Sequence, residues 1–137
     1  WKLIPINFYN GLLQVEFFSD FVRGRFPEIG DVPRMPPKRN GIAFEWNGGL
    51  VNAELRFSKV FAQNKTGDNE TPTDSYNLLN AHISYLHELR GLNSSELLFF
   101  LKMKNLLNED IRRSTSFLRN FTPEPGREIT LGFRYQF

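Results

Sequence analysis

The sequence predicts an all-β fold, an antiparallel up-and-down transmembrane β-barrel of which residues 1–137 supply the last six to seven strands. Three observations carry this prediction. Segment 128–137 alternates between apolar and polar side chains, and its length suits a tilted membrane strand of roughly 9–11 residues. Long and short connections alternate along the chain. Charged side chains fall on the polar faces of the expected strands, where they suit a watery lumen: Glu54, Arg56, Lys102, Lys104 and Arg134.

The amino-terminal part predicts a strand on each side of a turn. Residues 1–10 are expected to be the end of an earlier strand and its turn. Segment 12–26 is expected to be a strand, because Leu13, Val15 and Phe17 lie on one side of it, although the alternation is lost after Phe17. Segment 27–38 holds four prolines, which cannot donate ladder hydrogen bonds, and therefore predicts a loop.

The middle of the chain predicts a β-hairpin. Residues 42–46 and 51–57 both alternate, and each has one apolar and one polar face. They flank Asn47-Gly48-Gly49, whose residues tolerate the positive φ that a tight turn requires. Segment 63–74 is polar and rich in turn formers, so it predicts a long exposed loop.

The carboxyl-terminal part predicts three more strands. Residues 76–87 and 97–103 alternate, with Leu98 and Phe100 as apolar exceptions on the polar face of the second run. A short turn is expected at 90–95. Segment 105–127 is irregular and charged, and the final strand follows it. The expected connections are therefore long at 27–38, short at 47–49, long at 63–74, short at 90–95 and long at about 109–127, which is typical of an outer-membrane barrel.

Composition excludes several classes of protein. Seventeen basic and fifteen acidic residues give a net charge of +2, which provides no reason to expect a nucleic-acid partner. The chain has no cysteine, so it has neither a disulfide framework nor a thiolate metal site. A mean hydropathy of −0.40 and the lack of a long apolar run exclude a transmembrane helix but leave a barrel open, because the lumen-facing half of a barrel is polar.

Alternation by itself leaves a second solution open, a soluble antiparallel β-sandwich that serves as a binding module. If the chain forms a membrane barrel, six or seven strands are too few to close it, since the smallest outer-membrane barrels have about eight. An open edge in lipid would leave backbone groups unsatisfied at several kcal/mol each. The chain is therefore expected to be part of a larger barrel, and its start at Trp1 instead of Met agrees with that expectation.

Several motifs lie in the carboxyl-terminal half: Tyr76-Asn77-Leu78-Leu79-Asn80-Ala81, Lys104-Asn105-Leu106-Leu107-Asn108, Pro125-Gly126-Arg127 and the terminal Phe137. Together they resemble the carboxyl end of TonB-dependent outer-membrane receptors. Residues 31–37 are similar to a loop that adjoins a barrel strand in that family, and residues 115–119 are similar to a loop of receptors for metals or metal chelates. The resemblance spans nearly the whole chain and is sharpest over 76–137.

The resemblance implies a barrel of about 22 strands, plugged by an amino-terminal domain that this chain lacks. It implies the outer membrane of a Gram-negative bacterium as the location and energised uptake of a scarce solute, such as a ferric siderophore or another metal complex, as the function. The implied partners are outer-membrane lipid, the barrel-assembly machinery, the metal-chelate solute and, through the missing amino-terminal part, TonB. Residues 1–137 would supply barrel wall and the last external loops.

Candidate site residues follow from these expectations. Tyr135 and Phe137 are expected to form the signal that the assembly machinery reads. Trp46 and Tyr85, with that carboxyl-terminal pair, lie near strand ends and are candidates for the aromatic girdle at headgroup depth, with ordinary packing as the alternative. The last long loop carries basic candidates for contact with an anionic chelate, or simply solvated charge: Arg112, Arg113 and Arg119.

An enzyme is not expected. The sequence shows no nucleophile–base set, no phosphate-binding glycine loop and no cluster of metal ligands, and no cofactor is implied. His82 and His87 lie on opposite faces of their expected strand, so they cannot share one metal ion. Three hypotheses remain open: a receptor segment, a soluble sandwich, and another outer-membrane barrel such as a porin or a translocator. The sequence does not name the solute.

Overall fold

The computed structural model describes residues 1–89 and 95–137, and within them the chain forms β-strands and no helix. Their bounds are β1 (Ile6–Phe8), β2 (Gly11–Asp20), β3 (Arg25–Phe26), β4 (Gly30–Asp31), β5 (Arg39–Asn47), β6 (Val51–Val60), β7 (Tyr76–Leu89), β8 (Ser95–Lys104) and β9 (Glu128–Gln136). In the described part of the chain, no helix has the length and apolarity that crossing a membrane demands. The predicted all-β class is therefore confirmed.

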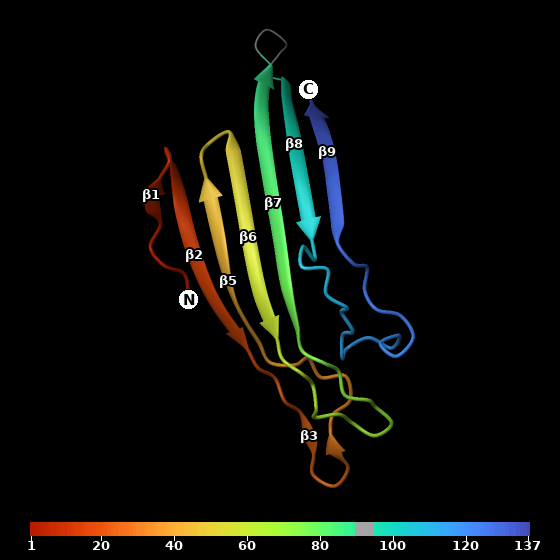
Figure 1. Cartoon of the computed structure of the whole chain (residues 1–137). Coiled ribbons are helices and arrows are strands. Elements are labelled where there is room, and N and C mark those ends of the chain that lie inside the picture. Colours follow the sequence, from red (N-terminus) through yellow and green to blue (C-terminus); the bar gives the residue numbers. More distant parts are fainter. Residues whose placement is uncertain (90–94) are drawn as a thin grey trace.

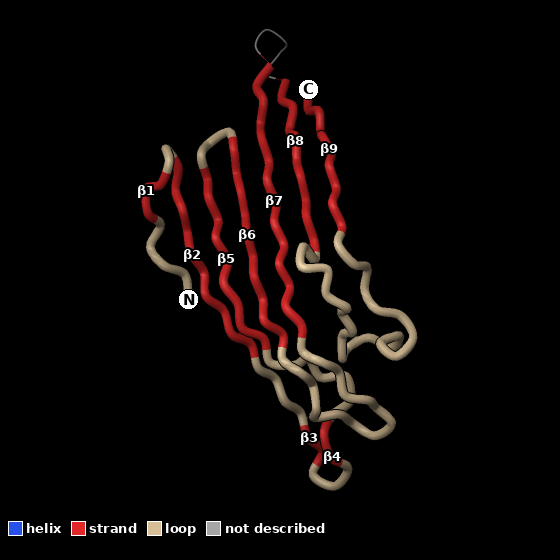
Figure 2. The backbone as a smooth tube through the Cα atoms, viewed as in Figure 1, coloured by secondary structure: helices blue, strands red, loops and turns tan. Residues whose placement is uncertain are grey.

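Seven strands of the described residues form one antiparallel sheet, the main sheet, in the order β1-β2-β5-β6-β7-β8-β9 (Figure 1). Each of these strands pairs with the next along the chain, which is the predicted up-and-down arrangement. The separate β3–β4 hairpin is inserted between β2 and β5, within a long loop (Figure 2). The main sheet is open, and within the described residues β1 and β9 are its two edges.

The connections sort by length between the two ends of the main sheet. Residues 9–10 and 48–50 make short turns at the end that is uppermost in Figure 1. The long connections 21–38, 61–75 and 105–127 all emerge at the opposite end. The expected turn at 90–95 lies outside the described residues except for Ser95, which already begins β8.

The expected strand 12–26 is wrong at its carboxyl end. β2 ends at Asp20, and residues 25–31 fold into the β3–β4 hairpin, with Gly30 at a φ of 115°. The reason lies in the partner strand. β2 pairs with β5 as far as Asp20 opposite Arg39, and the prolines at 36 and 37 just before β5 have no N–H groups with which to extend the ladder.

The expected hairpin at 47–49 is confirmed. Gly49 has a φ of 79°, a conformation that glycine adopts without steric penalty. The Gly49 backbone N–H donates to the Asn47 side-chain oxygen over 3.0 Å, and the Gly48 N–H donates to the Val51 carbonyl over 2.9 Å. This turn joins β5 to β6 in the register that places Trp46 opposite Ala53.

The register gives the main sheet one apolar and one polar face, because directly paired residues point to the same side. One row across the sheet consists of Leu13, Trp46, Ala53, Ile83, Leu101 and Leu131. The adjacent row on the other face consists of Gln14, Glu45, Glu54, His82, Lys102 and Thr130. We call these two sides the apolar face and the polar face.

The buried hydrophobic side chains of the described strands all lie on the polar side of the main sheet. Val60 and Tyr76 pair with one another on the polar face near the long-loop end, and Ile111 packs on them and is only 1% exposed. Ile111 comes from the 105–127 loop, so this loop folds back over the polar face. In a soluble protein the core would form against the apolar face. Here the hydrophobic cluster lies against the polar face instead.

Candidate functional site

The apolar face is uncovered along its whole width. Large apolar side chains on five successive strands remain more than a third exposed, namely Phe44, Leu55, Ile83, Phe99 and Leu131. The exposure rises to 78% at Leu131 on the β9 edge. A soluble sandwich would bury this face under a second sheet at a distance of roughly 10 Å. Contiguous exposed apolar surface of this extent is a feature of interaction or membrane sites.

Charge is sorted between the two faces. Among the described strands of the main sheet, every acidic residue and all the basic residues but one occupy polar-face positions of the register. The exception is Lys59, which stands between Asn40 and Asn77 on the apolar face at its long-loop end. The central part of the apolar face, four residues or so along each strand, therefore carries no charge.

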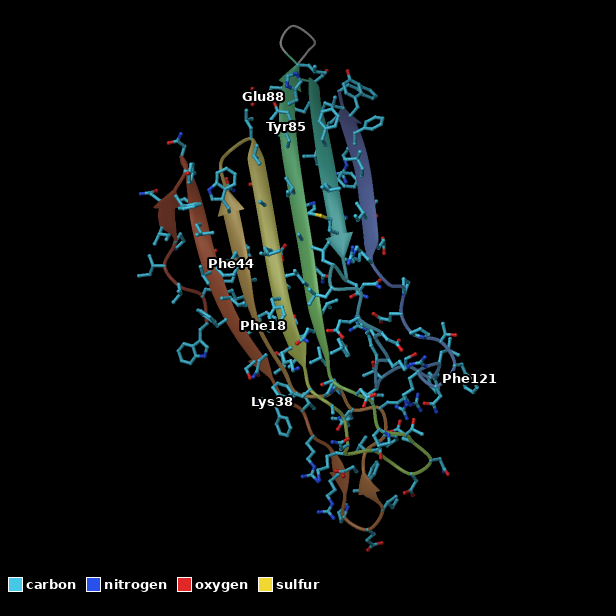
Figure 3. All side chains as sticks on the ribbon, viewed as in Figure 1. Phe18, Lys38, Phe44, Tyr85, Glu88 and Phe121 are labelled. Carbon is cyan, nitrogen blue, oxygen red and sulfur yellow. The ribbon has the colours of Figure 1, made fainter. Side chains whose placement is uncertain are left out.

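Aromatic side chains gather on the apolar face at the short-turn end. Trp46 donates its indole N–H to the Phe8 carbonyl over 2.8 Å, and the rings of Tyr135 and Phe137 stack at 5.8 Å. Tyr85 lies at the same end of β7 (Figure 3), and its hydroxyl oxygen is 3.3 Å from Nδ1 of His87. The candidate girdle residues thus lie at the same end of the sheet but at successive levels of its register. Their contact with headgroups stays a prediction.

The polar face carries a cluster of charges around Arg56. Its guanidinium donates to Glu54 over 3.0 Å and lies 3.6 Å from Glu16 and 4.0 Å from Glu45. Glu45 and Glu54 face one another directly across β5 and β6, a juxtaposition of like charges that is unfavourable in a sheet. Arg56 offsets that repulsion, and all four side chains remain partly open to solvent.

Two aromatic residues on the polar face, Phe18 and Phe100, have a local explanation. Phe18 faces Gly41, and Phe100 faces Gly132, and each ring lies against its glycine so closely that a Cβ there would overlap it. An aromatic ring shields the exposed backbone of a cross-strand glycine in this way. Lys102 lies over the Phe100 ring at 5.4 Å. Sequence alternation could not reveal these pairs, because they depend on register.

The three long loops pack together into one body, the loop assembly (residues 21–38, 61–75 and 105–127). At its centre Arg119 forms an ion pair with Glu70 over 3.3 Å, with side chains 8% and 10% exposed. Backbone N–H groups of Arg34 and Gly67 donate to the same carboxylate over 2.9 and 3.1 Å. Burial alone would raise the pKa of Glu70, but these donors and the Arg119 charge outweigh it and hold the pKa below its ordinary value of 4.5.

The other two arginines of the last loop are also engaged within the chain. Arg113 forms a bidentate pair with Glu124, and this hydrogen bonding raises the pKa of its guanidinium further. Arg112 donates to the Arg119 carbonyl over 2.7 Å and lies 3.5 Å from Asp110. All three candidate arginines therefore hold the loop assembly together, and a role for them in ligand contact stays a prediction.

Asparagines begin and end the 105–127 loop. Asn105 has a φ of 47°, and its side-chain oxygen accepts a hydrogen bond from the Glu109 N–H over 3.0 Å. The Asn105 backbone N–H donates to the Asn80 side-chain oxygen over 3.0 Å. The side-chain oxygen of Asn108 accepts from the Arg127 N–H over 3.0 Å, which ties the start of the loop to its end. The motifs at 104–108 and 125–127 therefore shape this loop.

A hollow of about 390 Å³ lies where the loop assembly meets the polar face. Its lining includes Asp20, Arg39, Tyr76, Arg113 and Thr115. Asp20 and Arg39 form an ion pair over 2.5 Å, and the rest of the lining includes apolar side chains such as Val60 and Leu78. A hollow of this size and mixed lining suits a small solute in transit or a structural water cluster.

His82 and His87 occupy opposite faces of β7, as expected, since His82 pairs with polar-face Lys102 and His87 with apolar-face Leu97. Among residues 1–89 and 95–137, no group of three or more His, Cys, Asp or Glu side chains is arranged to hold a metal ion. Comparison of the sequence with known protein families finds no family whose model matches. Membership of the TonB-dependent class therefore stays a prediction.

Proposed function

We propose that the chain is a carboxyl-terminal part of the barrel of an outer-membrane active-transport receptor of the TonB-dependent class. In this account the apolar face is the lipid-facing wall and the polar face lines the lumen. The loop assembly stands outside the cell and takes part in capturing a scarce solute, such as a ferric siderophore or another metal complex. The location is the outer membrane of a Gram-negative bacterium.

The observation that carries the proposal is the uncovered, charge-free centre of the apolar face. Burying one large apolar side chain stabilises a protein by roughly 1.5–3 kcal/mol relative to leaving it in water. The apolar face carries many such side chains, and none of this stabilisation is gained if the face is in water. In a soluble sandwich the long loops or a second sheet would cover this side, whereas the loop assembly covers the polar side. In a bilayer, lipid acyl chains would cover the apolar face and remove it from water without any protein partner.

The open edges support a larger barrel. β9 presents an unpaired edge along 128–136, and in hydrocarbon every unpaired backbone group is unfavourable by several kcal/mol. Further strands that lie outside these residues would pair with β9 on one side and with the β1–β2 edge on the other. Closure by such strands removes both edges, as it does in all membrane barrels.

Loop sorting gives the orientation. Bacterial barrels place short turns on the periplasmic side and long loops outside the cell. The loop assembly is thereby external, and the hollow that it shares with the polar face opens toward the lumen. The transport step itself, driven through TonB and a plug domain outside residues 1–137, rests on the motif resemblance, as does the reading of Tyr135 and Phe137 by the barrel-assembly machinery.

Membrane fractionation of the full-length gene product tests this proposal. We expect recovery in the outer-membrane fraction and a gel mobility that changes on heating, because folded barrels resist detergent until heated. A deletion strain should then grow poorly when its metal is supplied only as a chelate. Recovery as a water-soluble monomer with heat-independent mobility would contradict the proposal and favour the sandwich, and unimpaired growth on every chelate tested would favour a porin or a translocator.

A further inference from the structure

Lys59 is a charged residue on the otherwise uncharged apolar face. Within the described strands of the main sheet it is the one charged residue on that side, and it makes no ion pair. Its cross-strand neighbours Asn40 and Asn77 are neutral. An ammonium group that faces lipid is strongly unfavourable at the bilayer midplane and much less so near the interface. Lys59 therefore marks the margin of the membrane-facing band.

Lys38 adds a second unpaired cation at the same margin. Phe61 donates its backbone N–H to the Lys38 carbonyl over 3.0 Å, which places Lys38 directly opposite Phe61 and diagonally next to Lys59. Diagonal neighbours on one face lie about 7–8 Å apart, a separation that one phosphate group can bridge. The Lys38 ammonium stands 5.5 Å from the centre of the Phe61 ring, and it lies where the strands give way to the loops (Figure 3).

The surface beside Lys38 is hollowed and carries further positive charge. A hollow of about 240 Å³ is lined by Lys38, Lys65, Arg23 and Asp31, and by the ring of Phe21, which is 69% exposed. Asp31 pairs with Arg23 over 3.0 Å, and the hydrogen bond from Arg23, together with its charge, holds the pKa of that carboxyl below its ordinary value. Among the described residues, no carboxylate lies within ion-pair distance of the lysines at 38, 59 and 65, so this margin carries an excess of positive charge that attracts anions.

We propose that Lys38 and Lys59 bind the phosphate of an anionic membrane lipid in the leaflet on the long-loop side. This inference rests on the proposed function, because it needs the apolar face to lie in a bilayer. The lipid chains would run along Phe57 and Leu79, which precede the lysine row on the apolar face, and the exposed rings of Phe21 and Phe61 would lie at headgroup depth.

Native mass spectrometry of the full-length protein, with added phosphatidylglycerol or phosphatidylcholine, tests the inference. Each basic residue near an anionic surface contributes about 1 kcal/mol, or about five-fold in affinity. We therefore expect K38Q/K59Q to bind phosphatidylglycerol about 25-fold more weakly than the wild type and K38R/K59R to restore most of the affinity. The matched control K102Q/K104Q, on the polar face, should bind as the wild type does.

The outcomes separate the inference from the proposed function. A membrane-embedded, heat-modifiable protein whose K38Q/K59Q variant binds phosphatidylglycerol as tightly as the wild type overturns the inference alone. Equal binding of both lipids by the wild type also overturns it. Displacement of the lipid by millimolar inorganic phosphate would assign the lysines to a free anion instead. A wild-type protein recovered in the soluble fraction overturns the proposed function and the inference together.

Discussion

Arg119 in one long loop forms a buried ion pair with Glu70 in another, with the guanidinium Nη2 and the carboxylate Oε1 3.3 Å apart. The two residues are far apart in the sequence, and the same carboxylate is held by backbone N–H groups of Arg34 and Gly67. One acidic side chain therefore connects all three long loops. Without it the loop assembly would lose its central contact, while other contacts between the loops, such as the hydrogen bond from the Ser114 hydroxyl to the Met35 carbonyl, would remain.

Removing this carboxylate should loosen the loop assembly without unfolding the sheet. In an E70A variant the Arg119 guanidinium is left buried without its partner, at roughly 1–3 kcal/mol of local stability. We expect faster tryptic cleavage within 61–75 and 105–127 and an unchanged heat-modifiable mobility of the barrel. The matched control is E28A, since Glu28 is exposed on the surface of the same assembly. Equal cleavage rates in E70A and E28A would refute the central role of Glu70.

The same pair predicts acid sensitivity of the loops. Because the pKa of Glu70 in the folded protein lies below its ordinary value of 4.5, the stabilisation is complete above that value and is lost as the pH falls through the lower folded pKa. Hydrogen exchange of the loop assembly should therefore be flat from neutral pH to about 5, once corrected for intrinsic rates, and rise below the ordinary value. An E70Q variant should show no such rise, and a rise of the same size would assign it to another group.

Gly132 should not tolerate a side chain while Phe100 covers it. A Cβ at position 132 would overlap the ring, so Phe100 in a G132A variant must leave its position, at roughly 1–3 kcal/mol. We expect a lower urea midpoint for G132A. In an F100A background the same substitution should have little effect, since the ring is absent. Equal losses in both backgrounds would show that the glycine is needed for another reason.

Arg56 should be needed to keep Glu45 and Glu54 side by side. An R56Q variant leaves the two facing carboxylates without their shared cation, and we expect a loss of about 1 kcal/mol in the free energy of unfolding. An added E54Q substitution should recover part of that loss. R134Q, also on the polar face, serves as the control. A double variant no more stable than R56Q would contradict the electrostatic explanation.

The strands could be predicted because apolar and polar side chains alternate within the sequence of each strand. β5, β6 and β9 are correct to within a few residues, and so is the tight turn at 47–49. The end of β2 could not be predicted from its own residues, because the prolines that end its pairing precede its partner strand. Phe18 and Phe100 similarly acquire their meaning only from the glycines opposite them.

The contacts within the loop assembly could not be predicted from the sequence. They join residues widely separated in the chain, as when the Ser114 hydroxyl donates to the Met35 carbonyl over 3.0 Å. Loop charge predicts solvated arginines or anion contacts, yet Arg113 and Arg119 are paired with Glu124 and Glu70. Long-range pairing of this kind has no local signal. Only the abundance of both charges in the loops suggests that they neutralise one another.

Contact between the apolar face and lipid can be measured directly. Residues 1–137 contain no cysteine, so once any cysteine elsewhere in the full-length protein has been replaced by serine, single cysteines can be placed at Leu131 and Phe99 on the apolar face and at Thr130 and Lys102 on the polar face. Each is then labelled with a fluorophore. Lipids brominated on their acyl chains quench only fluorophores that they touch. If the apolar face lies in the bilayer, we expect strong quenching at 131 and 99 and almost none at 130 and 102. Equal quenching on both faces, or none at 131 and 99, would contradict that placement.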